Sequence, residues 1–338
     1  MKHSDERTAI EAAMRAAFPL ADERVARFYA MQEYHLGWRD EELRPATFDP
    51  GKLLRPRLCL LSCRAVGGDP RDALPLAAAI QLIHDFSLIH DDIQDQSDTR
   101  RGRPTVWKLW GLAQGINTGD GMFTVAHLSL HRLALTSLPA ATILDVLRRF
   151  DETILTICEG QFLDLSYEGN LEIDEAAYLA MIERKTAALI AASAELGALV
   201  GGADEETIQA LFDFGRALGL AFQIEDDVLG IWGDPAVTGK PFAADLYRRK
   251  LSLPVIHALT TSPDRERLMS LYAQATLDDD AVHQALAILD AAGSRVYAEA
   301  TAAAYHGEAF AALDRARGDA AALEELRAIA TSLLGRRA

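Results

Sequence analysis

Residues 73–95 read ALPLAAAIQLIHDFSLIHDDIQD, and in this stretch a strongly apolar run leads directly into three aspartates. Its apolar residues recur three and four positions apart, which predicts a helix that is buried on most of its surface. Residues 211–230, LFDFGRALGLAFQIEDDVLG, have the same arrangement and lead to Glu225, Asp226 and Asp227. The sequence therefore predicts two buried helices that run into groups of carboxylates.

The other long segments show the same helical spacing, and no sustained alternation of Val, Ile and Thr is bounded by tight turns. We therefore expect an all-α fold, a large helical bundle. Breaks between helices are expected at residues 45–51, 67–70, 101–104, 169–174, 201–204 and 233–241. None of them has the composition of a linker, so we expect a single domain over residues 1–338.

Composition and charge limit the class of protein. The 338 residues are 49% hydrophobic and 25% charged, which is enough for a core without disulfides or a structural metal. The formal net charge of −16 argues against sequence-independent binding to nucleic acid, which depends on Lys and Arg. Residues 1–14 lack the apolar segment of a secretory signal, and Ser193 and Glu195 interrupt the most apolar run, residues 187–202. We expect a cytoplasmic protein without a transmembrane helix.

The three cysteines, Cys59, Cys63 and Cys158, cannot all pair with one another. Cys59 and Cys63 also lack the neighbouring histidines and cysteines of a zinc site. We expect all three to be buried, reduced thiols.

The first acidic group suits a divalent metal. Asp91 and Asp95 are four residues apart and share one face of a helix, whereas Asp92 lies about 100° round from Asp91. Carboxylates at a helix C-terminus meet the negative end of the helix dipole, which a metal ion would compensate. A lone motif of this kind is more often a solvated helix end. The second acidic group favours Mg2+, which binds a few carboxylates together with waters and substrate phosphates.

Basic residues flank both acidic groups, as phosphate recognition requires. Lys52 and Arg55 follow Pro50-Gly51, Arg100 and Arg101 follow the first acidic group, and Lys240 and Lys250 follow the second. Taken singly, each cation is more often a surface residue. None belongs to a Gly-x-x-x-x-Gly-Lys-Ser/Thr loop, so the pattern favours phosphate recognition by separate Arg and Lys residues with a bridging metal.

Taken in order, these residues resemble the trans-isoprenyl diphosphate synthase (polyprenyl synthetase) family, of the geranylgeranyl/farnesyl type, from Gly51 to Pro254. The first motif spans residues 88–95, LIHDDIQD, and is followed by residues 100–105, RRGRPT. The second spans residues 222–230, FQIEDDVLG, and is followed by Gly239-Lys240, by Asp245 and Lys250, and by residues 252–254, SLP. Gly160-Gln161 with Asp164, and Lys185-Thr186, lie between them.

The resemblance implies a bundle of the isoprenoid synthase type with a central active-site cavity. It implies an enzyme that joins isopentenyl diphosphate to an allylic diphosphate of C5, C10 or C15, with three Mg2+ ions in each substrate-bound site. A homodimer is also expected from the family.

The resemblance implies roles for individual residues. Asp91, Asp95 and Asp226 would be direct Mg2+ ligands, and Asp92, Asp227 and Asp245 would be supporting or water-mediated ones. Arg100, Lys185 and Lys240 would contact the allylic diphosphate, Lys52, Arg55, His84 and Arg101 would contact isopentenyl diphosphate, and Lys250 belongs to the substrate-binding set. Gln223 and Thr186 would line the reacting centre, and Gln161 and Asp164 would orient it. His84 has an alternative interpretation as a histidine packed on an apolar helix.

Product length in such enzymes would depend on residues one turn before Asp91. Ser87 is small, Phe86 is bulky, and the motif has no insertion between its aspartates. By resemblance to the family this combination favours geranylgeranyl diphosphate, C20, with C15 or C25 as alternatives. Phe86 can also be read as ordinary core packing.

The sequence departs from the family pattern at several positions. Pro50 replaces a second glycine, and Leu53 replaces a basic residue near the predicted isopentenyl diphosphate site. Gly230 replaces a frequent aspartate, and Glu225 often has a basic counterpart. Leu251 replaces a frequent lysine. We expect activity to survive these changes because the leading aspartates remain.

Two other classes of protein share parts of this pattern. A class I terpene cyclase normally has an Asn/Asp, Ser/Thr, Glu triad on the later helix, where this chain has Asp226, Gly230 and Asp234. A non-catalytic synthase subunit would show decay of an acidic motif, and both leading pairs persist. The sequence favours the synthase over either alternative.

Overall fold

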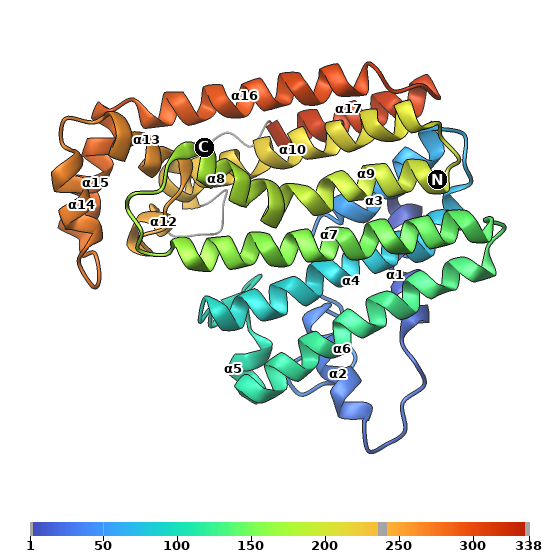
Figure 1. Ribbon diagram of the computed structural model, residues 1–338. Coiled ribbons are helices and arrows are strands. Elements are labelled where there is room, and N and C mark those ends of the chain that lie inside the picture. The colour runs from blue at the N-terminus through green and yellow to red at the C-terminus, as the bar shows by residue number, and fades with distance from the viewer. Residues whose placement is uncertain (1–2, 50, 236–241, 335–338) are drawn as a thin grey trace. The chain divides into compact units, whose positions relative to one another are not determined.

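The computed structural model describes residues 3–49, 51–235 and 242–334, and nearly all of its regular elements are helices (Figure 1). The all-α expectation is therefore confirmed. The chain divides into two compact units, one of residues up to Arg149 with Leu196–Asp204, and one of Phe150–Glu195 with residues from Glu205 onward.

The first unit holds the N-terminal helices and a short hairpin. Its elements are α1 (His3–Ala17), α2 (Ala26–His35), α3 (Leu54–Ala65), α4 (Pro70–Gln94), β1 (Thr99–Arg100), β2 (Arg103–Pro104), α5 (Val106–Trp110), α6 (Leu112–His131), η1 (Arg132–Leu135), the first part of α7 (Ala140–Tyr167) and the last part of α9 (Ala188–Val200). Helices α4 and α6 run side by side in this unit (Figure 1).

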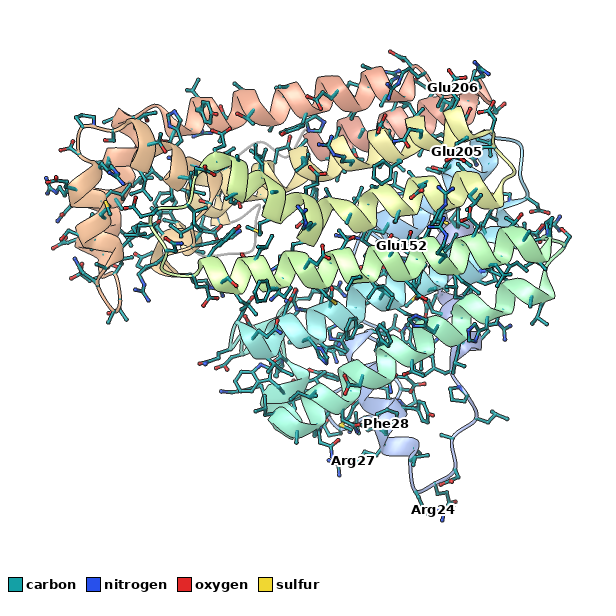
Figure 2. The ribbon with its side chains drawn as sticks, in the orientation of Figure 1. Arg24, Arg27, Phe28, Glu152, Glu205 and Glu206 are labelled. Atoms are coloured by element: carbon teal, nitrogen blue, oxygen red, sulfur yellow. The ribbon has the colours of Figure 1, made fainter. Side chains whose placement is uncertain are left out.

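The second unit holds the remaining helices. Its elements are the rest of α7 and α9, together with α8 (Glu175–Ile182), η2 (Glu183–Ala187), α10 (Glu205–Trp232), α12 (Ala244–Tyr247), α13 (Leu253–Thr261), α14 (Arg265–Tyr272), α15 (Asp279–Ala291), α16 (Ser294–Leu313) and α17 (Ala320–Leu334). Helix α16 lies along α10 (Figure 1). The first turn of α10 carries Glu205 and Glu206, whose negative charges suit the positive end of its dipole (Figure 2).

Helix α4 is the helix predicted from residues 73–95. Asp69 caps its N-terminus by accepting a hydrogen bond from the Arg71 backbone N–H at 2.9 Å, and Pro70 occupies the first helical position. Its length and hydropathy would also allow a membrane span, but 61% of the apolar window is buried inside the structure. A core helix has these properties too, so the apolar run of α4 is weak support for a membrane span.

The hairpin after α4 brings Arg100 back to the first acidic motif. Thr99 and Arg100 pair with Pro104 and Arg103, and the two residues between the strands have positive φ angles, +51° at Arg101 and +73° at Gly102. This is the backbone of a two-residue type I′ turn. The sequence predicted a break at residues 101–104, and the structure shows that the break is a hairpin.

Two glycines bring α10 very close to its neighbours in the second unit. A Cβ atom at Gly219 would lie 2.5 Å from Ala187 Cα, and one at Gly215 would lie 2.7 Å from Ala191 Cα. Both contacts are too close for any side chain, so the α10 backbone packs directly on η2 and α9. The same face continues at four-residue intervals to Gln223 and Asp227.

The segment η2 interrupts the α8–α9 helical run with one turn of π-helix that contains Lys185 and Thr186. A Cβ atom at Gly160 of α7 would lie 2.3 Å from the Lys185 backbone nitrogen, so α7 passes η2 at backbone distance only because residue 160 is glycine. Single π turns within helices often occur at functional sites.

Most of the predicted breaks are confirmed, since the described residues of 45–51, together with residues 67–69, 169–174 and 201–204, lie between helices, and Pro70 begins α4. The break at 233–241 falls partly outside the described residues. Cys59 and Cys63 are buried as predicted, and burial raises the pKa of the Cys63 thiol to about 12. The prediction for Cys158 was wrong, because this residue lies on an exposed face of α7.

Candidate active site

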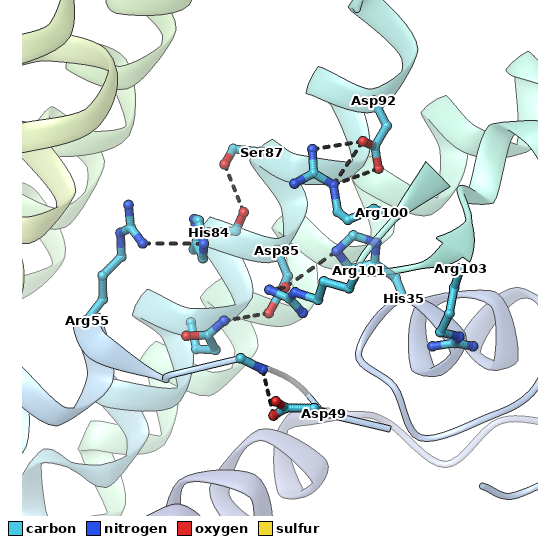
Figure 3. Close-up of polar contacts among 12 residues, drawn as sticks. His35, Asp49, Arg55, His84, Asp85, Ser87, Asp92, Arg100, Arg101 and Arg103 are labelled. Atoms are coloured by element: carbon cyan, nitrogen blue, oxygen red, sulfur yellow. Dashed lines mark hydrogen bonds and ion pairs between the residues drawn. The ribbon is translucent and has the colours of Figure 1, made fainter. Parts of the chain in front are cut away.

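The first acidic motif lies at the C-terminal end of α4, where its three aspartates have different surroundings. Asp91 is half-buried, Asp95 is exposed, and the Asp92 side chain is only 2% exposed. The Arg100 Nε atom donates to both Asp92 carboxylate oxygens, at 2.8 and 3.0 Å (Figure 3). Asp92 therefore anchors a predicted diphosphate-binding arginine through a charge-assisted pair.

A cavity of about 320 Å3 lies beside this pair in the first unit. Its wall is formed by Tyr34, His35, Gly37, Phe48, Asp49, Gly51, Asp92, Arg100, Arg101, Arg103, Pro104, Thr105 and Val106. Two of the predicted substrate-binding residues, Arg100 and Arg101, therefore line one cavity. Three arginines in a small cavity make it suitable for an anion such as a diphosphate.

Arg103 stabilises the wall of this cavity. Its guanidinium carbon lies 3.9 Å from the ring centroids of both Tyr34 and Phe48. The same group donates to the backbone carbonyls of Tyr34, at 3.0 Å, and Arg39, at 2.7 Å. Stacking and hydrogen bonding together explain why arginine suits this position better than lysine.

The structure brings together two residues predicted to bind isopentenyl diphosphate. Arg55 Nη1 lies 3.3 Å from His84 Nε2 (Figure 3). Burial holds the pKa of His84 well below its usual value, and the neighbouring Arg55 guanidinium lowers it further. His84 is therefore a neutral imidazole that can accept a hydrogen bond from Arg55. Lys52, which precedes α3, is exposed, whereas the Leu53 side chain is buried.

The residues predicted to control product length lie on α4. Phe86 is half-buried, and its ring centroid lies 4.8 Å from that of His90 and 5.3 Å from that of Phe123 on α6. Ser87 Oγ donates to the His84 carbonyl at 2.8 Å. The phenyl ring of Phe86 is therefore held within an aromatic cluster between α4 and α6.

The second acidic motif places Asp227 at the centre of a buried hydrogen-bond network. Its side chain is fully buried and accepts hydrogen bonds from Gln223 Nε2 at 3.2 Å, Lys250 Nζ at 3.0 Å and the Leu253 backbone N–H at 3.3 Å. The Tyr178 hydroxyl also donates to it. Four donors satisfy this carboxylate, as a buried anion requires.

The predicted residues of the reacting centre are connected to this network. Thr186 Oγ donates to Gln223 Oε1 at 2.9 Å, and Gln223 in turn donates to Asp227. Lys185 Nζ donates to Asp164 on α7. Thr186, Gln223 and Asp227 thus form a chain of hydrogen bonds in which the orientation of each side chain depends on the next.

Sequence reasoning missed two partners of the second motif. Tyr178 gave no signal beyond its apolar neighbours, although its hydroxyl contacts Asp227. His306 on α16 lies 3.1 Å from Glu225 Oε1, and both side chains are largely buried. This contact explains how an acidic residue is accommodated at position 225.

Lys240, which was predicted to contact the allylic diphosphate, lies outside the described residues.

Gly230 leaves room for another predicted metal-site residue. A Cβ atom at position 230 would lie 2.2 Å from Asp245 Oδ2, so the Asp245 carboxylate occupies the space of the missing side chain. Lys250 Nζ lies 3.8 Å from the same carboxylate oxygen. Gly230 therefore lets the Asp245 carboxylate from α12 pack directly against the backbone of α10.

We expect Gly230→Ala to lower the free energy of unfolding by about 1–3 kcal/mol, because the added methyl group overpacks the contact with Asp245. Urea unfolding followed by circular dichroism measures this change. Gly307→Ala is the matched control, since nothing lies within 4 Å of a Cβ atom there. Alanine in the interior of α16 should be neutral or stabilising. Equal destabilisation by both variants would contradict the steric explanation.

The carboxylates of the first motif fit Mg2+. Among the described residues, no three His, Cys, Asp or Glu side chains come close enough to hold a metal by themselves. Mg2+ does not need such a cage, because it usually binds one or two carboxylates and completes its shell with waters and substrate phosphates. Asp91, in the last turn of α4, and Asp95, the C-cap residue of α4, offer only oxygen ligands and are not buried. This donor set suits Mg2+ that binds together with a diphosphate.

Comparisons with known proteins identify the family of the chain. Residues 38–289 match the family model described as polyprenyl synthetase. The chain is 44% identical over 265 residues to a geranylgeranyl diphosphate synthase of Mycobacterium tuberculosis, covering 78% of this chain and 75% of that protein. It is 40% identical over 274 residues to a (2E,6E)-farnesyl diphosphate synthase of the same species, covering 80% and 75%.

Solved structures show the same similarity over nearly the whole chain. A polyprenyl synthetase from Streptomyces coelicolor A3(2) has a TM-score of 0.89 and 36% identity, with 98% of each chain covered. A polyprenyl synthase from Caulobacter crescentus CB15, complexed with calcium and isoprenyl diphosphate, has a TM-score of 0.82 and 29% identity, with 99% of this chain and 96% of that chain covered. The chain therefore belongs to the polyprenyl synthetase family and is a trans-prenyltransferase, a prenyl diphosphate synthase with the all-α isoprenoid synthase fold.

Proposed function

We propose that this enzyme condenses isopentenyl diphosphate with C5, C10 or C15 allylic diphosphates and releases all-trans geranylgeranyl diphosphate, C20. In this proposal, the Phe86 side chain determines the length of the product. It lies five residues before Asp91, and its ring packs against His90 and Phe123. It can therefore form a rigid floor, that is, a surface that stops the growing apolar chain. Ser87, one residue later, adds little bulk.

We assign the two diphosphates to different basic residues. Arg100 and Lys185, with Lys240, bind the allylic diphosphate, and Lys52, Arg55, His84, Arg101 and Lys250 complete the substrate-binding set. The bidentate contact of Arg100 with Asp92 supports this assignment, because it fixes a guanidinium at the edge of the cavity. The neutral His84 ring supports it as well, since it orients Arg55 without adding a competing charge.

Asp91, Asp95 and Asp226 would hold Mg2+, with Asp92, Asp227 and Asp245 in support, and we propose three ions in the substrate-bound site. Mg2+ held by these residues would supply positive charge to neutralise the diphosphate leaving group, so that the allylic C–O bond could ionise. The oxygens of Thr186 and Gln223 face the reacting centre in this proposal, where their dipoles stabilise the developing cation. The hydrogen-bond chain to Asp227 keeps those dipoles oriented.

The double bond of isopentenyl diphosphate then attacks the cation, and the proton that is lost passes to the released diphosphate. The protein contributes no nucleophile to these steps. We further propose that the two compact units act as one synthase domain, that the enzyme is a homodimer, and that it is cytoplasmic. The chemistry requires a site that keeps water from the cation.

The test is a product assay with Mg2+, isopentenyl diphosphate and, in separate reactions, the C5, C10 and C15 allylic diphosphates. Dephosphorylated products are resolved by mass and retention. The wild-type enzyme is expected to make linear C20 alcohol, and Phe86→Ala is expected to make longer products because the floor is removed. Phe310→Ala, which truncates a half-buried phenyl ring beside Arg327, is the matched control and should leave the product at C20.

Three other outcomes would change the proposal. Linear C15 or C25 products would keep the reaction and correct the chain length, and unchanged products from Phe86→Ala would remove Phe86 from the floor. Cyclic hydrocarbons from an allylic diphosphate alone would indicate a class I terpene cyclase. No turnover with any starter, despite intact fold, would favour a non-catalytic synthase subunit.

A further inference from the structure

One arginine of the cavity in the first unit, Arg101, forms an ion pair with a buried carboxylate, Asp85, to which the proposed reaction gives no role. The Asp85 side chain is 3% exposed and lies one residue after His84 on α4. Gln81 Nε2 donates to Asp85 Oδ2 at 2.8 Å, from one turn earlier on the same helix. His35 Nε2, at the end of α2, lies 3.4 Å from Asp85 Oδ1. Arg101 Nη2 lies 3.8 Å from the same oxygen (Figure 3).

Asp85 remains ionised in this position. Burial raises its pKa, but contact with His35 and the positive charge of Arg101 outweigh burial and bring the pKa down to about 2. A carboxylate out of water is costly unless a countercharge compensates it. Arg101 supplies that countercharge from the cavity side, so the two groups hold each other in place.

Arg101 is held differently from the two other arginines of the cavity. Arg100 makes hydrogen bonds of 2.8 and 3.0 Å to Asp92, and Arg103 is fixed by two aromatic rings and two carbonyls. Arg101 occupies the tip of the type I′ turn, its side chain is 33% exposed, and its ion pair with Asp85 is longer than a direct hydrogen bond. The Asp85 charge therefore orients the guanidinium while its N–H groups stay available to a ligand.

We propose that Asp85, supported by His35 and Gln81, is a positioning residue that holds Arg101 in the cavity so that it can bind the diphosphate of isopentenyl diphosphate. This inference rests on the proposed function, because it assumes that Arg101 contacts that substrate. Asp85 itself touches neither substrate. Its effect is specific to one of the two diphosphates, because Arg100 depends on Asp92 and not on Asp85.

The test uses Asp85→Asn, which keeps the shape of the side chain and removes its charge. We expect this variant to have a dissociation constant for isopentenyl diphosphate, measured by calorimetry, and a KM for the same substrate that are both about tenfold higher. Tenfold is about the lower end of the effect that loss of a supporting residue typically has. KM for the allylic diphosphate and kcat should stay within about twofold, since no group that contacts the reacting atoms changes. Asp72→Asn, which removes a charge from the first turn of the same helix, is the matched control and should behave as wild type.

A double-mutant cycle with Arg101→Gln decides whether Asp85 acts through Arg101. In the Arg101→Gln background, Asp85→Asn should cause no further loss of affinity for isopentenyl diphosphate. An equal loss in both backgrounds would overturn the proposal, as would wild-type affinity in Asp85→Asn or a parallel loss of affinity for both substrates. Each of these results separates positioning of Arg101 from general damage to the fold.

A second variant keeps the test decisive if Asp85→Asn does not fold. Gln81→Leu retains the Asp85 charge and removes the hydrogen bond that fixes the carboxylate, so affinity for isopentenyl diphosphate should fall by about threefold. Unchanged affinity in a folded Gln81→Leu protein would then overturn the proposal. The wild-type reaction is measured alongside, because absence of condensation by wild type defeats the proposed function, whereas normal condensation with unaffected variants defeats only the role of Asp85.

Discussion

Asp91→Asn is expected to lower kcat/KM by roughly 1000-fold, since a metal supplies several kcal/mol of charge stabilisation and each 1.4 kcal/mol corresponds to a factor of ten. Asparagine keeps the size of the side chain but cannot offer a charged oxygen to Mg2+. Steady-state kinetics at several Mg2+ concentrations measure the effect. The concentration of Mg2+ required for half-maximal rate should also rise, because the proposed metal site would lose one of its ligands.

Asp98→Asn is the control for Asp91→Asn, because Asp98 follows the motif closely but forms an exposed ion pair with Lys108 at 3.0 Å. Surface pairs of this kind contribute at most about 1 kcal/mol, and we expect rates within about twofold of wild type. If Asp91→Asn retained more than a tenth of the wild-type kcat/KM, the assignment of Asp91 as a metal ligand would be wrong. Thermal unfolding of both variants shows whether either has lost its fold.

Asp227→Asn is expected to lower the free energy of unfolding by about 3 kcal/mol, because it breaks a buried charged pair and leaves donors facing an amide. An asparagine carbonyl cannot accept all the bonds that Tyr178, Gln223, Lys250 and the Leu253 backbone now donate. We also expect kcat to fall by about 100-fold, as a displaced dipole near the reacting centre costs that much. Urea unfolding and steady-state kinetics provide the two measurements.

The charge state of Lys250 decides the pH range of the Asp227 effect. Burial lowers the pKa of Lys250, but the carboxylates of Asp227 and Asp245 outweigh burial and raise it above its usual value. A lysine with a raised folded-state pKa contributes stability that is fully present below its unfolded pKa, about 10.4, and is lost only in more alkaline solution. Asp227→Asn should therefore be destabilised throughout the neutral range.

Asp213→Asn is the matched control for Asp227→Asn. It lies on the same helix, α10, but it is partly exposed and pairs with Arg315 at the surface. We expect a loss of stability of no more than about 1 kcal/mol and unchanged kcat. Comparable losses in the two variants would show that the Asp227 network has no special importance.

The sequence by itself determined the helical class and the two motifs. Apolar residues three and four positions apart indicate a helix with one buried face, because the period of the helix is a local property of the backbone. The shared face of Asp91 and Asp95 follows from the same period. The order and spacing of the motifs are also properties of the sequence, and they are enough to indicate the family.

The partners of the site residues were decided only by the tertiary structure. Asp92 was expected to support a metal, yet it also anchors Arg100 on strand β1. Asp227 and Tyr178 are 49 residues apart, and no repeating pattern along the chain links them. Likewise, the sequence around Gly230 does not show that the Asp245 carboxylate fills the space beside this glycine. Such contacts depend on how closely helices approach, and that distance is set by packing between segments far apart in sequence.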